Sequence, residues 1–521
     1  MRTIGAKAQQ TVDREAPSRL GITLHDLMIR AAEAVVRVVL LRLRDDRHPV
    51  VFVCGSGNNG GDGYAAAHRL AALGHDVSVL EAAPERPRSS LAARERALAD
   101  KAGLLRIVDP GTAFPDHCLV VDAVFGAGYS ALRPLDPAVS ALFLAVEDAR
   151  SRGATVVSVD LPSGVEADTG RACPGAVQAD ATVTFVRPKP GLFLYPGRRY
   201  AGRIVTDPIG IPALLVDELL SGLPDEPLLL DAASIHPLAV PRPADAHKGT
   251  FGRVLVTGGS PGMGGAATLA VGAALRSGAG LVQALVPKDA RVGIDARHPE
   301  ALGAAVDPFP PDPATALRLS ADKQAVLVGP GLAPDPAAEE LVAALCVCPS
   351  PVVLDAGALT LAAFRPERFV PLLASRVSRG MPYAVLTPHP GEFGRLAPDL
   401  DRSDPVAAAR DCASRWSSVV VLKGAGTVVA SPDGRCAINT TGNDGLSKAG
   451  SGDVLAGLLA GLLAQGMDPW EAACAAVCLH GMAADIAARR SGRRSMLPGD
   501  LALCFGDAFK QAGWENNTWM E

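Results

Sequence analysis

The sequence lacks several features that would place it in a membrane, secreted or nucleic-acid-binding class. Its first residues contain no apolar core of a signal peptide, and the apolar run Val454–Leu463 is too short and glycine-rich to span a bilayer. The formal net charge of −5 argues against a nucleic-acid surface, although backbone N–H groups could still hold a nucleotide. We therefore expect a cytoplasmic protein with no nucleic-acid partner and no membrane contact.

The sequence also lacks a Cys-X-X-Cys pair, because its ten cysteines are scattered. Cys474, Cys478 and His480 lie close together and could in principle hold a metal, but their spacing matches no common ligand pattern. We expect the cysteines to be small buried residues in a reducing compartment.

Length and composition predict a folded protein of several domains. The chain has 521 residues, of which 48% are hydrophobic and 20% charged, and we find no internal repeat. Strand-like and helix-like segments alternate from residue 10 to about 215 and again from 253 to about 512, which favours two α/β domains with parallel sheets. Proline-rich residues 221–246 predict an irregular linker. We predict domains at 1–222 and 223–513, and a tail at 514–521.

The first glycine-rich segment, Gly55–Gly63, follows a predicted strand and leads into a predicted helix. A helix N-terminus offers free N–H groups to a phosphate, and glycines allow close approach. The segment is neither a Walker A loop nor the usual dinucleotide fingerprint. Asp122 and Asp160 also end predicted strands and are followed by glycines. Because ligands bind at the carboxyl ends of parallel strands, a ligand site is favoured over isolated capping carboxylates.

This half of the chain resembles the NAD(P)H-hydrate epimerase family, which has a Rossmann-like parallel-sheet fold. The segments that carry the resemblance are Leu27–Ala32, Gly55–Gly63, Asp122–Gly128, Asp160–Gly164, Arg187–Gly191 and Asp207–Pro212. The resemblance implies that the damaged dinucleotide contacts Asn58, Asn59, Gly60, Gly61, Asp62, Gly126, Ala127, Gly128, Tyr129, Ser130, Ala131, Leu132 and Asp160. It implies that Asp160 is the acid/base residue, and that Asn59, Asp122 and Ser163 bind K⁺.

The second glycine-rich segment, Gly450-Ser451-Gly452-Asp453, precedes a predicted helix near the end of the chain. Its backbone N–H groups could surround a transferring phosphoryl group, and Asp453 could take a proton from the attacking hydroxyl. This pattern resembles the ribokinase-like α/β fold. A simple glycine-rich helix cap is the alternative, but other loops at predicted strand ends favour an active site.

The full set of loops resembles the ADP-dependent NAD(P)H-hydrate dehydratase family. The segments are His247–Gly252, Gly258–Ala267, Val328–Leu332, Val353–Leu359, Leu386–Phe393, Val421–Thr427 and Asn443–Asp453. The resemblance implies that Asp453 is the base and that the hydrate contacts Ala266, Gly331, His389 and Asp453. It implies nucleotide contacts from Lys423, Gly424, Ala425, Gly426, Thr427 and Gly452. Two positions depart from the family pattern: Gly357 replaces an aspartate and Ser451 a threonine.

Together the two resemblances imply a bifunctional repair enzyme, an isomerase and a lyase in one chain. The first domain would interconvert the R and S forms of hydrated NADH and NADPH (NADHX and NADPHX) and use K⁺. The second would dehydrate the S form with ADP and Mg²⁺. The family resemblance also implies a homo-oligomer. Two alternatives are a small-molecule kinase of the hydroxymethylpyrimidine or sugar type, and a non-catalytic scaffold.

Overall fold

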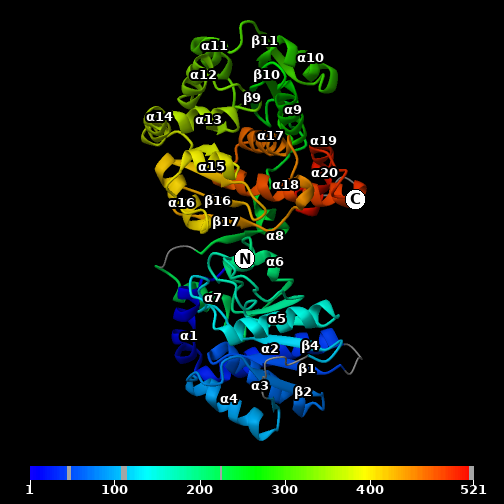
Figure 1. Cartoon of the computed structure of the whole chain (residues 1–521). Helices are drawn as coiled ribbons and strands as arrows, with labels where there is room; N and C mark the ends of the chain where they lie inside the picture. The colour runs from blue at the N-terminus through cyan, green and yellow to red at the C-terminus, as the bar shows by residue number, and fades with distance from the viewer. Residues whose placement is uncertain (44–47, 107–113, 223–225, 516–521) are drawn as a thin grey trace. The chain divides into compact units, whose positions relative to one another are not determined.

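The computed structural model describes residues 1–43, 48–106, 114–222 and 226–515, apart from the side chain of Ala305. Within it the chain forms two compact units, which are shown in Figure 1. We call residues 2–226 the N-terminal unit, and Met1 with residues 227–521 the C-terminal unit. The expected boundary at 222/223 adjoins residues 223–225, which the structure does not describe. Most of the tail expected at 514–521 also lies outside the described residues.

The N-terminal unit is a parallel seven-stranded sheet with helices on both faces (Figure 1). Its strands are β1 (Val50–Cys54), β2 (Val77–Glu81), β3 (Leu105–Arg106), β4 (Leu119–Ala123), β5 (Thr155–Val159), β6 (Ala181–Phe185) and β7 (Arg203–Asp207). Its helices are α1 (Ala6–Leu20), α2 (Leu24–Leu43), α3 (Asn58–Ala72), α4 (Ser90–Lys101), α5 (Pro137–Ser151), η1 (Pro190–Leu192), α6 (Gly197–Tyr200) and α7 (Ala213–Leu219).

The strand order β3-β2-β1-β4-β5-β6-β7 confirms the Rossmann-like fold expected for this half. Alternate residues of the buried strands pack against helices on opposite faces of the sheet. Phe52 belongs to the core formed with α1, α2 and α3, whereas Val51 and Val53 belong to the core formed with α5. The order reverses between β1 and β4, and the crevice outside their carboxyl ends is the expected ligand position.

The C-terminal unit has a ten-stranded sheet in the order β11-β10-β9-β12-β13-β14-β15-β16-β17-β8. Its strands are β8 (Leu228–Leu230), β9 (Arg253–Thr257), β10 (Leu281–Pro287), β11 (Leu302–Val306), β12 (Ala325–Val328), β13 (Val352–Leu354), β14 (Ala384–Leu386), β15 (Ser418–Leu422), β16 (Val428–Ala430) and β17 (Cys436–Asn439). Seven strands from β11 to β15 are parallel, and β16 pairs antiparallel with both neighbours. The region expected to be an irregular linker contributes β8, which pairs parallel to β17.

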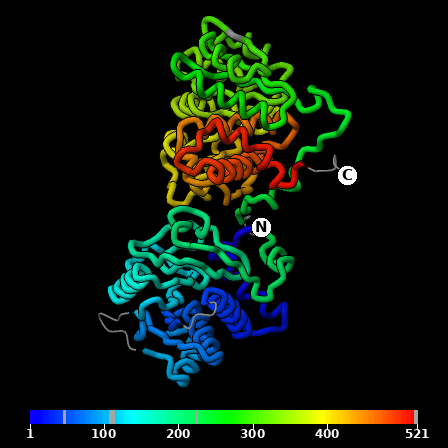
Figure 2. Tube along the Cα trace, turned by 90° about the vertical axis from the view of Figure 1, so that its right-hand side faces the viewer, coloured from blue at the N-terminus to red at the C-terminus, as the bar shows by residue number. Residues whose placement is uncertain are grey.

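Helices cover this second sheet. They are α8 (Ala232–Ile235), η2 (His236–Leu238), α9 (Gly264–Arg276), α10 (Lys288–Arg297), α11 (Pro313–Ser320), α12 (Pro336–Cys346), α13 (Gly357–Phe364), α14 (Pro366–Ser378), α15 (Pro390–Leu396), α16 (Pro405–Trp416), η3 (Asp444–Leu446), α17 (Ser451–Ala464), α18 (Pro469–Ser491), α19 (Pro498–Leu503) and α20 (Phe505–Gln511). In Figure 2 the orange and red segments of α17 and α18 run beside each other.

Close contact between α9 and α17 depends on small residues. A Cβ atom added to Gly457 would lie 2.2 Å from the backbone oxygen of Ala270, which is closer than atoms can pack. Glycine therefore lets the two helix backbones meet, and this fixes where the N-terminus of α17 lies.

Two minor expectations can be compared with the structure. All ten cysteines are free and buried, as expected. One described helix, Pro469–Ser491, is long and apolar enough to cross a membrane, but 83% of its most apolar window is buried inside the protein. Such burial is typical of a core helix, and Cys474, Cys478 and His480 lie on it.

Candidate functional sites

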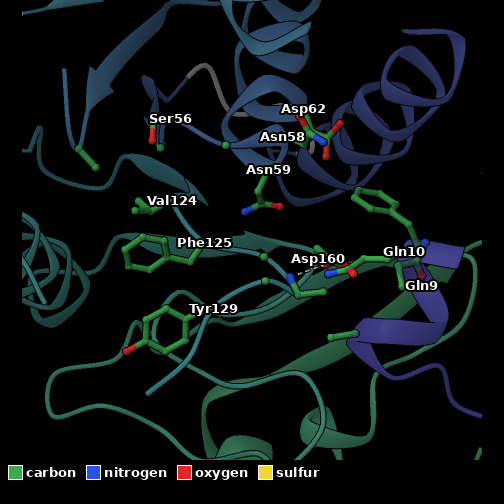
Figure 3. A pocket seen from close by; sticks show the side chains of 18 of the residues that line it. Gln9, Gln10, Ser56, Asn58, Asn59, Asp62, Val124, Phe125, Tyr129 and Asp160 are labelled. Atoms are coloured by element: carbon green, nitrogen blue, oxygen red, sulfur yellow. Dashed lines mark hydrogen bonds between the residues drawn. The ribbon is translucent and has the colours of Figure 1, made fainter. Parts of the chain in front are cut away.

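A cavity of about 680 Å³ opens at the carboxyl ends of β1, β4 and β5 in the N-terminal unit (Figure 3). The structure brings together nine of the predicted substrate residues in its lining: Asn58, Asn59, Asp62, Gly126, Ala127, Gly128, Tyr129, Ser130 and Asp160. The other four do not line it. Gly60 and Gly61 face inward from α3, and added Cβ atoms would collide with the Gly55 backbone and the Met28 side chain. These glycines allow packing beside the cavity.

The remaining predicted residues lie on the loop after Gly128. Leu132 is 76% exposed and is not part of the lining. The Ala131 N–H donates to a carboxylate oxygen of Glu166 at 2.8 Å, and the Ser130 hydroxyl donates to the same oxygen at 3.3 Å. Glu166 therefore ties this loop to the segment between β5 and β6. Glu166 lies in none of the sequence motifs; the motif before it in the chain ends at Gly164.

Helix α3 begins at Asn58, five residues earlier than the helix expected from Gly63. Residues 58–62 are thus in the first turns of a helix. The backbone N–H groups of residues 58–60 have no partner within the helix and remain free for a ligand, whereas the Gly61 N–H donates to the Gly57 oxygen. The side chain of Asn59 is buried, yet neither Oδ1 nor Nδ2 has a hydrogen-bond partner. A Cβ atom on Gly126 would lie 3.1 Å from Asn59 Oδ1, so the amide sits directly over that loop. Both polar atoms are available to a ligand or ion.

The other two predicted K⁺ ligands, Asp122 and Ser163, are hydrogen-bonded to each other. The Ser163 hydroxyl donates to Asp122 Oδ1 at 2.5 Å, and the Ser163 N–H donates to Asp122 Oδ2 at 2.8 Å. Burial raises the pKa of Asp122, while these hydrogen bonds oppose the shift. Among the described residues, no three His, Cys, Asp or Glu side chains form a metal cluster. A cation here would depend on mixed oxygen donors, of which Asn59 Oδ1 is unpartnered.

Asp160 is held in an uncommon backbone conformation at the end of β5. Its φ angle is +64°, in the left-handed region that Asp tolerates better than most residues. Its carboxylate accepts from the Ala127 N–H and the Thr184 hydroxyl, both at 3.2 Å, and pairs with Lys189 Nζ at 2.5 Å. The Lys189 side chain is only 1% exposed. A strained residue with a buried ion pair at a cavity wall is typical of a functional group.

Lys189 was part of a sequence motif but was given no role, and α1 was not expected to reach the site. The lining includes Gln9 and Asp13 from that helix. Gln9 Nε2 donates to Asp13 Oδ1 at 2.7 Å. Burial raises the pKa of Asp13, and it raises the pKa of Asp62 well above its usual range, with repulsion from Asp160 and Asp13 adding to the shift.

In the C-terminal unit, the carboxyl ends of adjacent parallel strands β13, β14 and β15 carry the charged groups. Asp355 follows β13, Glu392 follows β14 on the first turn of α15, and Lys423 follows β15. Lys423 Nζ lies 2.9 Å from Asp355 Oδ1 and 3.9 Å from Glu392 Oε2. Asp355 and Glu392 stood in predicted motifs, but the sequence reasoning did not select them as site residues.

The N-terminus of α17 brings Asp453 to this charged group. Burial raises the pKa of Asp453 to about 7; Asp355 and Glu392 add to the shift and Lys423 opposes it. A Cβ atom on Gly452 would lie 3.2 Å from Lys423 Nζ, so the start of the helix meets the lysine. The structure therefore joins predicted residues Lys423, Gly452 and Asp453. A carboxyl group with a pKa near neutrality can act as a base.

The other predicted residues of this unit surround the same sheet edge. Gly331 has φ +67°, and an added Cβ atom would lie 3.2 Å from Ala266 Cβ, so these two predicted hydrate contacts are neighbours. His389 caps α15: its Nδ1 accepts from the backbone N–H groups of Gly391 and Glu392. The loop of Gly424, Ala425, Gly426 and Thr427 is closed by the Thr427 hydroxyl, which donates to the Gly424 oxygen at 2.9 Å.

The local backbone is shaped for the glycine at position 357, where the family pattern has an aspartate. An added Cβ atom would lie 2.1 Å from the backbone oxygen of Leu332, and the preceding residue Ala356 has φ +47°. The backbone here is shaped around a glycine, so an aspartate would need the loop to move. Asp355 remains as the carboxylate at this strand end. Ser451 in place of threonine keeps its backbone at the start of α17.

Both units of the chain match known protein families. Residues 254–504 match the family model for NAD(P)H-hydrate dehydratase, and residues 24–191 match that for the YjeF-related protein N-terminus. The chain is 38% identical over 529 residues to a bifunctional NAD(P)H-hydrate repair enzyme of Moorella thermoacetica, covering 96% of this chain and 95% of that one. The Escherichia coli enzyme of the same name is 37% identical over 496 residues, covering 94% and 90%.

Among solved structures, the ADP/ATP-dependent NAD(P)H-hydrate dehydratase of Bacillus subtilis, co-crystallised with ATP and Mg²⁺, is 30% identical to this chain. That match covers 54% of this chain and 99% of the other, with a TM-score of 0.46. The full-length relatives, each covered over nearly their whole length, are the comparisons that settle the family. The chain belongs to the family of bifunctional NAD(P)H-hydrate repair enzymes.

Proposed function

We propose that this protein repairs hydrated NADH and NADPH in two steps, each carried by one unit. The N-terminal unit would interconvert the R and S hydrates, and the C-terminal unit would dehydrate the S form with ADP, giving reduced dinucleotide, AMP and phosphate. The observation that carries this proposal is the presence of two separate acid/base sites at strand ends. One contains Asp160 with Lys189, and the other contains Asp453 with Lys423.

For epimerisation, the hydrate's hydroxyl is attached to a carbon beside a ring nitrogen. The nitrogen lone pair can expel that hydroxyl as water once a proton is supplied, and water can return to the other face. Asp160 would exchange protons with this oxygen, and the α3 N-terminus with the 126–130 loop would hold the dinucleotide. Bound K⁺, held by Asn59, Asp122 and Ser163, would add positive charge close to the negatively charged diphosphate. The unpartnered Asn59 oxygen supports this ligand set.

For dehydration, Asp453 would take the proton from the hydrate's hydroxyl as that oxygen attacks the terminal phosphorus of ADP. A new P–O bond forms and the bond to AMP breaks. The ring nitrogen then expels phosphate, a far better leaving group than hydroxide, and the resulting C=N⁺ ion loses a proton from the neighbouring ring carbon to give the reduced ring. Backbone N–H groups of Gly452 and Asp453 would stabilise the transferring group. Mg²⁺ would neutralise phosphate charge among the carboxylates of Asp355 and Glu392. Lys423 and the 424–427 loop would contact the nucleotide, and Ala266, Gly331 and His389 the hydrate.

Several broader properties belong to the same proposal. The epimerase would comprise residues 1–222 and the dehydratase residues 223–513, close to the division of the chain at residue 226. We also propose a cytoplasmic homo-oligomer that uses ADP. A small-molecule kinase would instead use ATP on a vitamin or sugar, so the choice of nucleotide separates these functions.

The test follows the absorbance of reduced nicotinamide in a mixed pool of R and S hydrates with ADP, Mg²⁺ and K⁺. We expect full recovery with the wild-type protein and none without ADP. Asp160→Asn should stop recovery at the S share, whereas Asp453→Asn should abolish recovery but leave R/S interconversion intact. Loss of both activities from either single change would refute the two-site assignment.

A further inference from the structure

Two carboxyl groups from different elements face the N-terminal cavity in contrasting surroundings. Asp62 comes from the second turn of α3, and Asp160 follows β5. In Figure 3 the side chain of Asn59 is seen between them. Asp160 is ion-paired with Lys189 and accepts two further hydrogen bonds.

Asp62 has no such support. Among the described residues, no lysine, arginine or histidine forms an ion pair with it, and the charges that act on it include the like charges of Asp160 and Asp13. Two neighbouring carboxyl groups do not both ionise readily when only one has a cation beside it. Burial and these two charges raise the pKa of Asp62, while Lys189 only partly offsets them.

The other charged residues around the cavity do not supply Asp62 with an ion-pair partner among the described residues. The same cavity is lined by Arg86, Arg133 and Asp136, and Arg86 lies 3.8 Å from Asp136. On the helices packed against α3, His25 of α2 lies 2.7 Å from Glu95 of α4, and Arg69 of α3 lies 3.9 Å from Glu95. Arg86, His25 and Arg69 therefore have carboxylate partners of their own.

We propose that Asp62 is the general acid of the N-terminal site and that Asp160 is its general base. The assignment rests on the proposed epimerase function and adds a second catalytic residue to it. Pairs of carboxyl groups whose environments push them toward opposite protonation states are a known way to divide acid and base work.

The proton and bond changes then balance. Asp62 donates its proton to the hydroxyl oxygen of the R hydrate; the C–O bond breaks, water leaves, and the ring nitrogen forms a C=N⁺ bond. Water adds to the opposite face of that carbon and gives its proton to the Asp160 carboxylate, which yields the S hydrate. Asp62 then regains a proton from solvent and Asp160 loses one, and in the reverse direction their roles exchange.

The test measures R-to-S conversion by the full-length protein with ADP omitted, so that dehydration does not consume the product. Asp62→Asn keeps the shape of the side chain but cannot donate a carboxyl proton. We expect kcat to fall by about 100-fold or more, the usual contribution of one acid/base group, with hydrate affinity changed less than about threefold. Asp62→Glu should restore part of the rate.

Asp76→Asn is the matched control, because this exposed carboxylate precedes β2 at the opposite edge of the sheet; its rate should equal wild type. Wild-type kcat/KM should fall as pH rises and Asp62 ionises, and the residual rate of Asp62→Asn should lack that fall. A variant that keeps more than a third of kcat, or one that changes only KM, would overturn the assignment.

Two further outcomes keep the assignment testable. If Asp62→Asn fails to fold, a wild-type kcat/KM that shows no alkaline fall would overturn it alone. A wild-type protein that does not interconvert the hydrates above the protein-free rate would overturn the proposed epimerase function, and this assignment with it.

Discussion

The raised pKa of Asp453 predicts that dehydration depends on pH in the neutral range. Burial, with Asp355 and Glu392, places this pKa at about 7. Asp453 accepts a proton only when ionised, so activity is lost as pH falls through that value. The ionised share rises from roughly a tenth at pH 6 to roughly nine tenths at pH 8, and kcat/KM should rise about tenfold over that range.

The assay uses the S hydrate with saturating Mg²⁺ and follows the initial recovery of reduced-nicotinamide absorbance from pH 5.5 to 8.5. ADP also titrates in this range, so a variant is needed to separate the two effects. Glu392→Gln removes one negative charge near Asp453 and keeps an oxygen that can accept from the His389 N–H. The pKa of ADP is the same with either protein. The pKa of Asp453 should fall in Glu392→Gln, so the rise of kcat/KM with pH should occur at lower pH.

Two results would refute this reasoning. The first is a wild-type kcat/KM that stays constant between pH 6 and 8, because a base with a pKa near 7 cannot give a flat profile. The second is a rise of kcat/KM that occurs at higher pH in Glu392→Gln than in the wild type, because removing a like charge must favour ionisation of Asp453.

Three further predictions concern single side chains. Asn59→Ala removes two unpartnered buried polar atoms, and we expect weaker K⁺ activation of R/S conversion, measured by K⁺ titration with Na⁺ as the control ion. Gly457→Ala pushes α9 and α17 apart and should destabilise the C-terminal unit by about 1–3 kcal/mol in thermal melts; unchanged melting would refute the close contact. Buried Arg376 donates to four backbone oxygens, so Arg376→Met should cost about 3 kcal/mol or more, and urea unfolding would detect it.

The elements near the N-terminal site were predictable because their local patterns are strong. Apolar runs predict five strands, and each predicted range lies within one residue of the observed ends of β1, β2, β4, β5 and β6. The predicted ranges are Pro49–Cys54, Val77–Leu80, Cys118–Asp122, Thr155–Asp160 and Ala181–Val186. The start of α3 was missed by five residues, because a glycine- and asparagine-rich segment resembles a loop when read locally. In the tertiary structure the same glycines let the helix pack closely beside the strand ends.

The sequence by itself determined the two α/β units, the order of their motifs and the family, because hydrophobic periodicity and short motifs are local properties of the chain. Only the tertiary structure decided which charges meet. Lys189 reaches Asp160, Asp13 arrives from α1, and Lys423 bridges Asp355 to the start of α17. These partners are far apart in sequence, and the protonation state of a carboxyl group depends on burial and on charges brought close by folding.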